Sequence, residues 1–171
     1  MKIIKTKFKG LLIIESKNYY DKRGYFRELL IEKKIKQKFP FKVMSLSKKN
    51  VLRGLHFQIK TPQGKFISVL KGKILDVAVD IRKNSKTFGK HFKIILSEKN
   101  CRSVYIPPGF AHGFLGLQKN NLISYSCTNY RNKNNERGLL WNDKNLKIYW
   151  GINKPILSKK DNDNAKFKDL F

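Results

Sequence analysis

Two neighbouring stretches in the middle of the chain, Lys65 to Leu70 and Lys73 to Arg82, alternate their side chains with a period of two. This is the period of a β-strand, because successive side chains point to opposite faces of a sheet. In the second stretch one face carries Leu75, Val77, Val79 and Ile81, and the other carries Ile74, Asp76, Ala78 and Asp80. The connection Lys71-Gly72-Lys73 predicts a tight hairpin between the two strands.

Shorter segments of the same kind recur along the chain, with turn residues between them. The expected strands are Lys7 to Glu15, a strand after the turn at Asp21 to Gly24, the stretch from Lys42 onward, Phe92 to Leu96, Ser103 to Ile106, Ala111 to Leu117 and Leu122 to Asn129. Glu32 to Phe39 predicts one short helix, which Pro40 should end. Many short strands at a spacing of about 8–12 residues predict an all-β sandwich or barrel with one or two short helices.

The composition fits one folded domain over residues 1–171, since 40% of the residues are hydrophobic and 29% are charged. No apolar run approaches the ~18 residues of a membrane span, and Met1 to Lys9 lacks the apolar block of a signal peptide. The only cysteines, Cys101 and Cys127, are expected to be free thiols in a reducing compartment. These features predict a cytoplasmic protein that does not enter a membrane.

The net charge of +26 raises the question of nucleic-acid binding. The excess is almost all lysine, spread from Lys2 to Lys168 and mixed with many Asn and Ile residues. This distribution resembles a drift in composition more than a binding stripe, and no zinc-finger spacing or basic recognition helix accompanies it. We therefore expect no nucleic-acid partner, but a positive field that attracts a small anionic substrate.

The segment Val51 to Gln58 (VLRGLHFQ) predicts a strand with a glycine notch, with Arg53 and His56 near each other along it. Histidine changes protonation near neutral pH, and arginine offers a fixed fork of donors that suits phosphate. A base beside an anion clamp is what an enzyme acting on a phosphorylated, weakly acidic substrate needs. The alternative is a core histidine on an apolar strand.

Three further residues each allow two interpretations. Lys65 opens a strand soon after His56 and could stabilise an oxyanion or enolate, or it is one more solvated lysine. Tyr125 alternates with apolar neighbours, so its phenol could lie inside a barrel as a proton donor, or simply find a hydrogen-bond partner there. Asp161, taken alone, is an ordinary surface carboxylate.

The histidines His56, His91 and His112 could in principle bind a metal. A barrel metal site usually has two histidines close together and a carboxylate on nearby strands. His56 has no histidine two residues away, and His112 lies in Ala-His-Gly-Phe. We therefore expect no metal site.

Taken in order, several blocks match one family. They are Asp21 to Phe26 (DKRGYF), Val51 to Gln58, Gly64-Lys65, Phe88-Gly89 after Val79 to Arg82, Ile106 to Phe114 (IPPGFAHGF) and Pro155 to Asp161 (PILSKKD). With these blocks, the chain resembles the nucleotide-sugar 3,5-epimerases typified by dTDP-4-dehydrorhamnose 3,5-epimerase, from about Lys5 to Asp161. The resemblance implies a cupin-type jelly roll, usually a homodimer, with no metal or organic cofactor.

The resemblance also implies the chemistry. The substrate would be a nucleoside-diphosphate 4-keto-6-deoxy sugar, whose C3 and C5 protons are acidified by the neighbouring carbonyl. His56 would remove the proton with Asp161 as its partner. Tyr125 would return a proton from the opposite face, and Lys65 would stabilise the enolate oxygen. Arg23, Arg53 and Lys160 would contact the diphosphate or nucleotide, and Phe26, Glu28, His112 and Glu136 would also line the site.

The departures from the family fall at the base-binding positions. Members that recognise thymidine usually carry Gln-x-Asn where this chain has Phe41 and Val43, and an aromatic residue where it has Arg131, which could itself stack on a base. The expected function is epimerisation at C3 and/or C5 of a dTDP- or GDP-linked 4-keto hexose or heptose for surface polysaccharide. The alternatives are a 3-only epimerase, a non-catalytic sugar-nucleotide-binding cupin, a metal-dependent cupin enzyme and a basic nucleic-acid binder.

Overall fold

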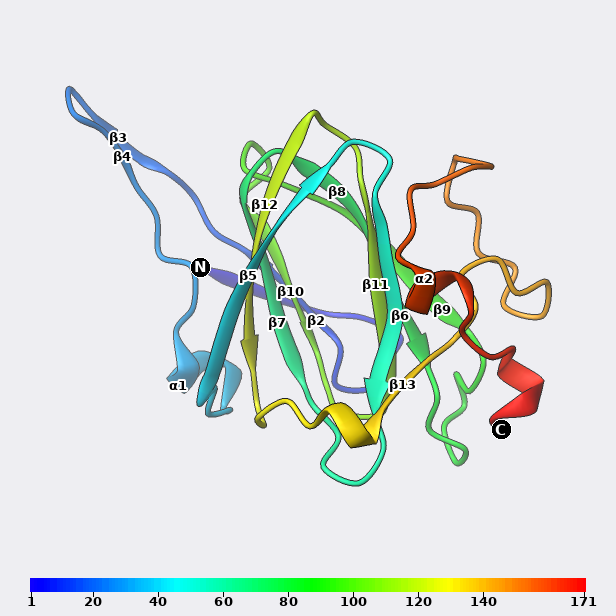
Figure 1. Cartoon of the computed structure of the whole chain (residues 1–171). Helices are drawn as coiled ribbons and strands as arrows, with labels where there is room; N and C mark the ends of the chain where they lie inside the picture. The colour runs from blue at the N-terminus through cyan, green and yellow to red at the C-terminus, as the bar shows by residue number, and fades with distance from the viewer.

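The computed structural model describes residues 1–171, and most of its strands form two antiparallel sheets that face each other (Figure 1). The first sheet has six strands in the order β1-β2-β10-β7-β12-β5, so that β5 is an edge strand. These strands are β1 (Lys2–Lys5), β2 (Leu12–Glu15), β10 (Arg102–Ile106), β7 (Lys65–Lys71), β12 (Asn120–Cys127) and β5 (Phe41–Lys48). The predicted all-β class is confirmed.

The second sheet has five strands in the order β13-β6-β11-β8-β9. These are β13 (Glu136–Gly138), β6 (Leu52–Gln58), β11 (Phe110–Gly116), β8 (Lys73–Asp80) and β9 (His91–Ser97). A separate hairpin of β3 (Tyr19–Asp21) and β4 (Gly24–Phe26) extends away from both sheets (Figure 1). The helices are α1 (Glu32–Ile35), α2 (Lys159–Asn162) and the 3₁₀ turns η1 (Lys133–Asn135) and η2 (Phe167–Asp169). None of them has the length and apolar character that a membrane crossing requires.

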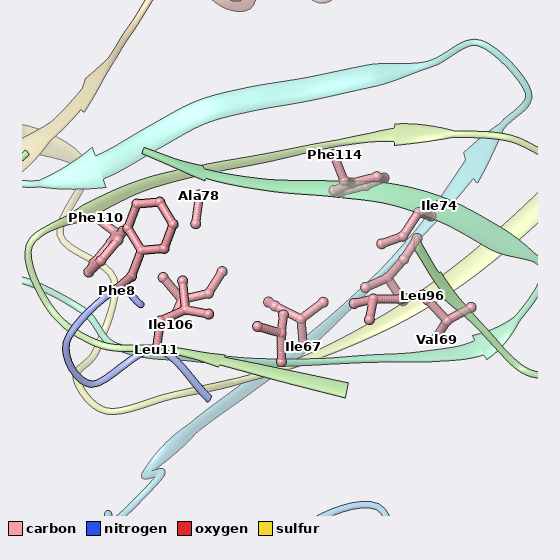
Figure 2. Packing of buried hydrophobic residues seen from close by; sticks show 12 residues of the cluster. Phe8, Leu11, Ile67, Val69, Ile74, Ala78, Leu96, Ile106, Phe110 and Phe114 are labelled. Atoms are coloured by element: carbon pink, nitrogen blue, oxygen red, sulfur yellow. The ribbon is translucent and has the colours of Figure 1, made fainter. Parts of the chain in front are cut away.

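A core of aliphatic and aromatic side chains fills the space between the sheets (Figure 2). Phe8 packs edge-on against Phe92 and Phe110, with ring centroids 5.9 and 6.3 Å away. Ile67 of β7 and Phe114 of β11 meet the same cluster from opposite sheets. Because burying a side chain of this size stabilises the fold by about 1.5–3 kcal/mol, this core fixes the separation of the two sheets.

The two faces of β8 enter different cores. Ile74 and Ala78 point into the core between the sheets. Val77 and Val79 point the other way, into a second core that includes Trp150 of the C-terminal segment. The predicted alternation along this strand is therefore confirmed. Both faces are buried because residues that follow β13 cover the outer side of the second sheet (Figure 1).

The predicted hairpin at Lys71-Gly72-Lys73 is wrong. β7 and β8 lie in different sheets, so Gly72 leads the chain from one sheet to the other. Gly72 has a φ of +90°, and a Cβ there would lie 2.3 Å from the carbonyl oxygen of Asn120. The side chain of Asn121 holds the crossing, since its Oδ1 accepts a hydrogen bond from the Lys73 N–H at 3.0 Å. Alternation is the same for strands that pair and strands that change sheets, so it did not distinguish them.

The first predicted strand is too long at its start. The chain forms a turn before the strand begins at Leu12, because the Leu11 N–H donates a hydrogen bond to the Phe8 carbonyl at 3.0 Å. This turn buries both of those side chains in the core between the sheets. The preceding strand β1, which pairs with β2, was not predicted.

The predicted helix Glu32 to Phe39 ends early, at Ile35. Lys36 adopts the left-handed conformation with a φ of 58°, which stops the helix. The chain then turns so that Phe39 is buried edge-on against Phe66, with ring centroids 6.1 Å apart. Burial of this aromatic ring therefore outweighs the helical pattern of the preceding residues.

Candidate active site

A cavity of about 430 Å³ is lined by residues of both sheets. Its wall comes from β5, β7 and β12 of the first sheet, from β6, β11 and β13 of the second, and from the segment around α2. A volume of this size is typical of a small-molecule site. Nine of the predicted site residues line it: His56, Tyr125, Asp161, Lys65, Arg53, His112, Arg131, Glu136 and Lys160.

Gly54 explains how Arg53 and His56 come to line the same cavity. Residues three apart in a regular strand point to opposite faces, but Gly54 has a φ of +114° and the pairing of β6 with β11 is irregular here. A Cβ on Gly54 would lie 2.6 Å from both the Gly113 Cα and the His112 carbonyl oxygen. The glycine notch therefore turns the guanidinium and the imidazole onto one wall.

His56 and Asp161 form a hydrogen-bonded pair, with Nε2 and Oδ1 2.5 Å apart. Asp161 is buried, and its backbone N–H donates to the Oγ of Ser158, the N-cap of α2, at 3.1 Å. Burial is the largest single effect on the pKa of Asp161 and raises it, but the hydrogen bond and electrostatic attraction of His56, together with hydrogen bonds from Ser158 and the Gly54 backbone, lower the pKa overall. A carboxylate that stays ionised fixes the histidine tautomer, because Nε2 donates to it and Nδ1 is left to accept a proton.

Tyr125 of β12 lies on the opposite sheet from His56. Its hydroxyl makes one hydrogen bond, to the Oγ of Ser45 on β5 at 2.9 Å. Burial raises the pKa of Tyr125 well above its ordinary value. The phenol is therefore protonated at neutral pH, in the state that can give a proton.

Lys65 begins β7 and reaches the same cavity without forming an ion pair. Its pKa is lowered, chiefly because burial disfavours the ammonium; Cys127, Glu136 and Asp76 partly oppose the shift. A cation with little water around it attracts a developing negative charge more strongly than an exposed lysine does.

His112 of β11 and Asp76 of β8 form a second buried pair, with Nε2 and Oδ2 2.8 Å apart. Asp76 lies on the inward face of β8, and its other carboxylate oxygen has no hydrogen-bond partner. The paired His112 also lines the cavity. The carboxylate thus fixes the orientation of the ring, as Asp161 does for His56.

Positive side chains gather around Glu136 at the cavity wall. The Glu136 carboxylate accepts hydrogen bonds from Arg131 at 2.5 Å and from Lys160 at 2.8 Å. These bonds, the one from Arg131 first, lower the pKa of Glu136 to about 2. Arg53 is held separately, since its Nε donates to Ser47 at 3.0 Å. Three cations around one cavity can hold a diphosphate.

Three predicted site residues lie away from this cavity. Arg23, Phe26 and Glu28 belong to the β3–β4 hairpin or the residue stretch just after it, which extends away from the sheets (Figure 1). Arg23 is exposed and pairs with Asp21 at 2.6 Å. Within one chain these residues do not meet the others.

Several cavity residues were not singled out as site residues, among them Ser45, Gln63 and Cys127. Ser45 could have been found from the sequence, because it follows Val43 by two residues and therefore points to the same face of the strand. Asp76, which pairs with His112 behind the cavity wall, was named in the sequence only as part of the alternating stretch Lys73 to Arg82. A carboxylate among Ile74 and Ala78 on a buried face is unusual enough to indicate a partner.

The three histidines do not form a metal site together. His91 lies apart, with its Nδ1 3.0 Å from the carbonyl oxygen of Leu146. No group of three or more His, Cys, Asp and Glu side chains is arranged to hold a metal ion.

Comparison with known proteins identifies the same family as the sequence blocks. A family model described as dTDP-4-dehydrorhamnose 3,5-epimerase matches residues 5–169. The protein of that name from Shigella flexneri is 43% identical, over 99% of this chain and 97% of its own. The one from Methanothermobacter thermautotrophicus is 42% identical, over 94% of this chain and 91% of its own.

Solved structures agree with this result. The dTDP-4-dehydrorhamnose 3,5-epimerase of Elizabethkingia anophelis superposes with a TM-score of 0.93 at 44% identity, covering 99% of this chain and 98% of its own. A dTDP-6-deoxy-D-glucose-3,5-epimerase of Legionella pneumophila, solved with dTDP-4-keto-L-rhamnose, gives 0.94 at 40% identity, covering 99% and 94%. The predicted jelly roll is confirmed.

Proposed function

Because this chain belongs to the dTDP-4-dehydrorhamnose 3,5-epimerase family, we propose that it inverts C3 and C5 of a nucleoside-diphosphate 4-keto-6-deoxy sugar. One observation carries the proposal. His56 and Tyr125 line the same cavity from opposite sheets, and each is hydrogen-bonded to a partner, His56 to Asp161 and Tyr125 to Ser45. Inversion at carbon requires a base and an acid on opposite faces of one planar intermediate, and we assign these roles to His56 and Tyr125.

The steps follow from the groups present. The C4 carbonyl acidifies the protons on C3 and C5, and neutral His56 removes one of them. The electron pair moves to the carbonyl oxygen, where the Lys65 ammonium stabilises the enolate. Tyr125 then gives a proton to the opposite face of the same carbon, which inverts it. Asp161 stabilises the imidazolium that forms, as a carboxylate does in other His-Asp pairs.

Arg53, Arg131 and Lys160 hold the diphosphate in this proposal. Phosphate oxygens take bidentate hydrogen bonds from guanidinium groups. Arg131 and Lys160 are already paired with Glu136, so an incoming diphosphate shares cations that the protein has placed beforehand. Holding the sugar in this way keeps each reacting carbon beside the base and the acid.

The base-binding end differs from that of thymidine-specific members, so we propose that GDP-linked as well as dTDP-linked sugars are substrates. Phe41 and Tyr130 pack at a ring separation of 5.9 Å, near Val43 and Arg131. Apolar and stacking contacts of this kind discriminate weakly between bases compared with hydrogen bonds. A substrate on either base is consistent with these side chains.

We also propose a homodimer in which the β3–β4 hairpin reaches a second copy. Tyr20, Tyr25 and Phe26 on this hairpin are at least half exposed, and aromatic side chains gathered on one projection are expected to be covered by a partner. The hairpin would bring Arg23, Phe26 and Glu28 to the partner's cavity.

The free buried thiols of Cys101 and Cys127 fit an enzyme that works in the cytoplasm.

The experiment that tests the proposal is deuterium incorporation from D2O. The enzyme is mixed with 4-keto sugars on dTDP and on GDP, including a 4-keto heptose, and followed by NMR. Deuterium at C3 and C5 is the expected result, lost in His56→Ala. Deuterium at C3 alone identifies a 3-epimerase. No exchange on any substrate, with nucleotide still bound, would leave a binding protein.

A further inference from the structure

A double epimerase that uses one base and one acid must reset both between its two inversions. After the first inversion His56 holds the proton taken from carbon, and Tyr125 has lost the proton it gave. The second carbon needs neutral His56 and neutral Tyr125 again. This requirement rests on the proposed function, and it calls for a route by which the tyrosinate regains a proton.

Ser45 lies where such a route would begin. Its Oγ is 2.9 Å from the Tyr125 hydroxyl and is the only hydrogen-bond partner of that side chain in the structure. Ser45 also lines the cavity. It lies on β5, which pairs with β12 on one side and has no strand on the other. Both Ser45 and Tyr125 line the cavity, so water in the cavity can reach the serine hydroxyl that is bonded to the phenol.

The environment of the phenol makes such a connection important. Tyr125 is packed against Phe114, with ring centroids 6.4 Å apart, and burial disfavours its ionised form. A hydroxyl that donates to the tyrosinate stabilises it at the moment it forms. The same hydroxyl can then pass on a proton, since serine both donates and accepts.

We propose that Ser45 relays the proton that resets Tyr125 between the two inversions. The Ser45 O–H gives its proton to the tyrosinate, and Ser45 Oγ takes a proton from a water molecule in the cavity. The hydroxide left behind is neutralised by the proton that the His56 imidazolium releases. The sum is the transfer of one proton from His56 to Tyr125, with no net gain or loss.

The test follows product composition with time in D2O for Ser45→Ala and Ser45→Thr. If reset is slowed, the sugar inverted at one centre leaves or waits before the second inversion. We expect Ser45→Ala to raise the ratio of singly to doubly inverted product during turnover by about 10²-fold, the lower end of what a positioned proton-transfer group contributes. Ser45→Thr keeps a hydroxyl and should restore the wild-type ratio.

Ser124→Ala is the matched control. Ser124 precedes Tyr125 on β12 and lines a groove on the other face of the sheet, so its loss should leave the ratio unchanged. The proposal is overturned if Ser45→Ala slows both inversions equally, or if Ser45→Thr fails to restore the ratio while remaining folded. A wild-type enzyme that exchanges neither carbon would instead overturn the proposed function.

Discussion

The His56 imidazole and the Asp161 carboxylate lie 2.5 Å apart although 105 residues separate them in the chain. His56 comes from β6 of the second sheet, and Asp161 comes from α2. Ser158 caps this four-residue helix, and its Oγ accepts the Asp161 N–H. A short capped helix is thus enough to place a buried carboxylate behind the imidazole.

Asp161→Asn should lower kcat by about 10²–10⁴-fold with little change in KM. An amide has the shape of the carboxylate but favours the wrong tautomer of His56 and does not stabilise its imidazolium. The measurement is the initial rate of inversion by NMR. Asp163→Asn is the control, because Asp163 is exposed and pairs only with neighbouring side chains. Retention of the wild-type kcat by Asp161→Asn would show that the pair has no catalytic role.

The sequence predicted the strand that carries Arg53 and His56, but not which other segments complete the site. The block around Arg53, Gly54 and His56 predicted a notched strand, because a glycine in an apolar strand indicates a close approach of backbone. It did not predict that β11 makes that approach through Gly113. The role of Asp161 came from the family resemblance alone, since a carboxylate after two lysines is otherwise an ordinary surface residue.

Non-local contacts also explain the errors in the fold. The period of two correctly predicted the two strands around Gly72. Whether these strands pair depends on Asn120 and Asn121, which are almost fifty residues further along the chain. Ser45 was overlooked for the same reason, because its importance comes from a contact with Tyr125 on a neighbouring strand. Period and turn residues are local, whereas pairing partners are set by the whole core.

Lys65→Met should lower kcat by about 10²–10³-fold and raise the free energy of unfolding at pH 7 by about 1–2 kcal/mol. Methionine keeps the length of the side chain without a charge to desolvate. The pKa of Lys65 is lowered in the folded protein, so between that value and its ordinary value of 10.5 the unfolded chain binds more protons. The cost of burying the ammonium therefore disappears as the pH rises towards 10.5.

Urea unfolding at pH 7 and at pH 10 measures this difference between Lys65→Met and the wild type. The advantage of the variant should shrink at pH 10. Lys71→Met on the same strand is the control, because Lys71 is exposed. A variant that loses stability at pH 7 would contradict the expectation that the ammonium is costly.

Glu136→Gln should destabilise the fold by about 1–2 kcal/mol at pH 7, allowing for the screening of the half-exposed Arg131 and Lys160. Hydrogen bonds from Arg131 and Lys160 hold the pKa of Glu136 at about 2, below its ordinary 4.5. A lowered carboxylate pKa contributes stability that is complete above 4.5 and is lost as the pH falls towards 2. The gap between wild type and variant in urea unfolding should therefore close over this range. A gap that does not change with pH would mean that the charge of Glu136 contributes nothing.

We expect kcat/KM for dTDP- and GDP-linked substrates to agree within about tenfold, because the apolar side chains of Phe41 and Val43 offer no hydrogen bonds that distinguish one base from another. The double variant Phe41→Gln/Val43→Asn should shift the preference towards dTDP by about tenfold or more, since two amides can then pair with the polar edge of thymine. Lys42→Gln is the control and should have no effect, because Lys42 lies between these two residues but lines the groove on the other face of the sheet. A strong preference for one base that survives the double substitution would place base recognition elsewhere, with Arg131 and Tyr130 the next side chains to replace.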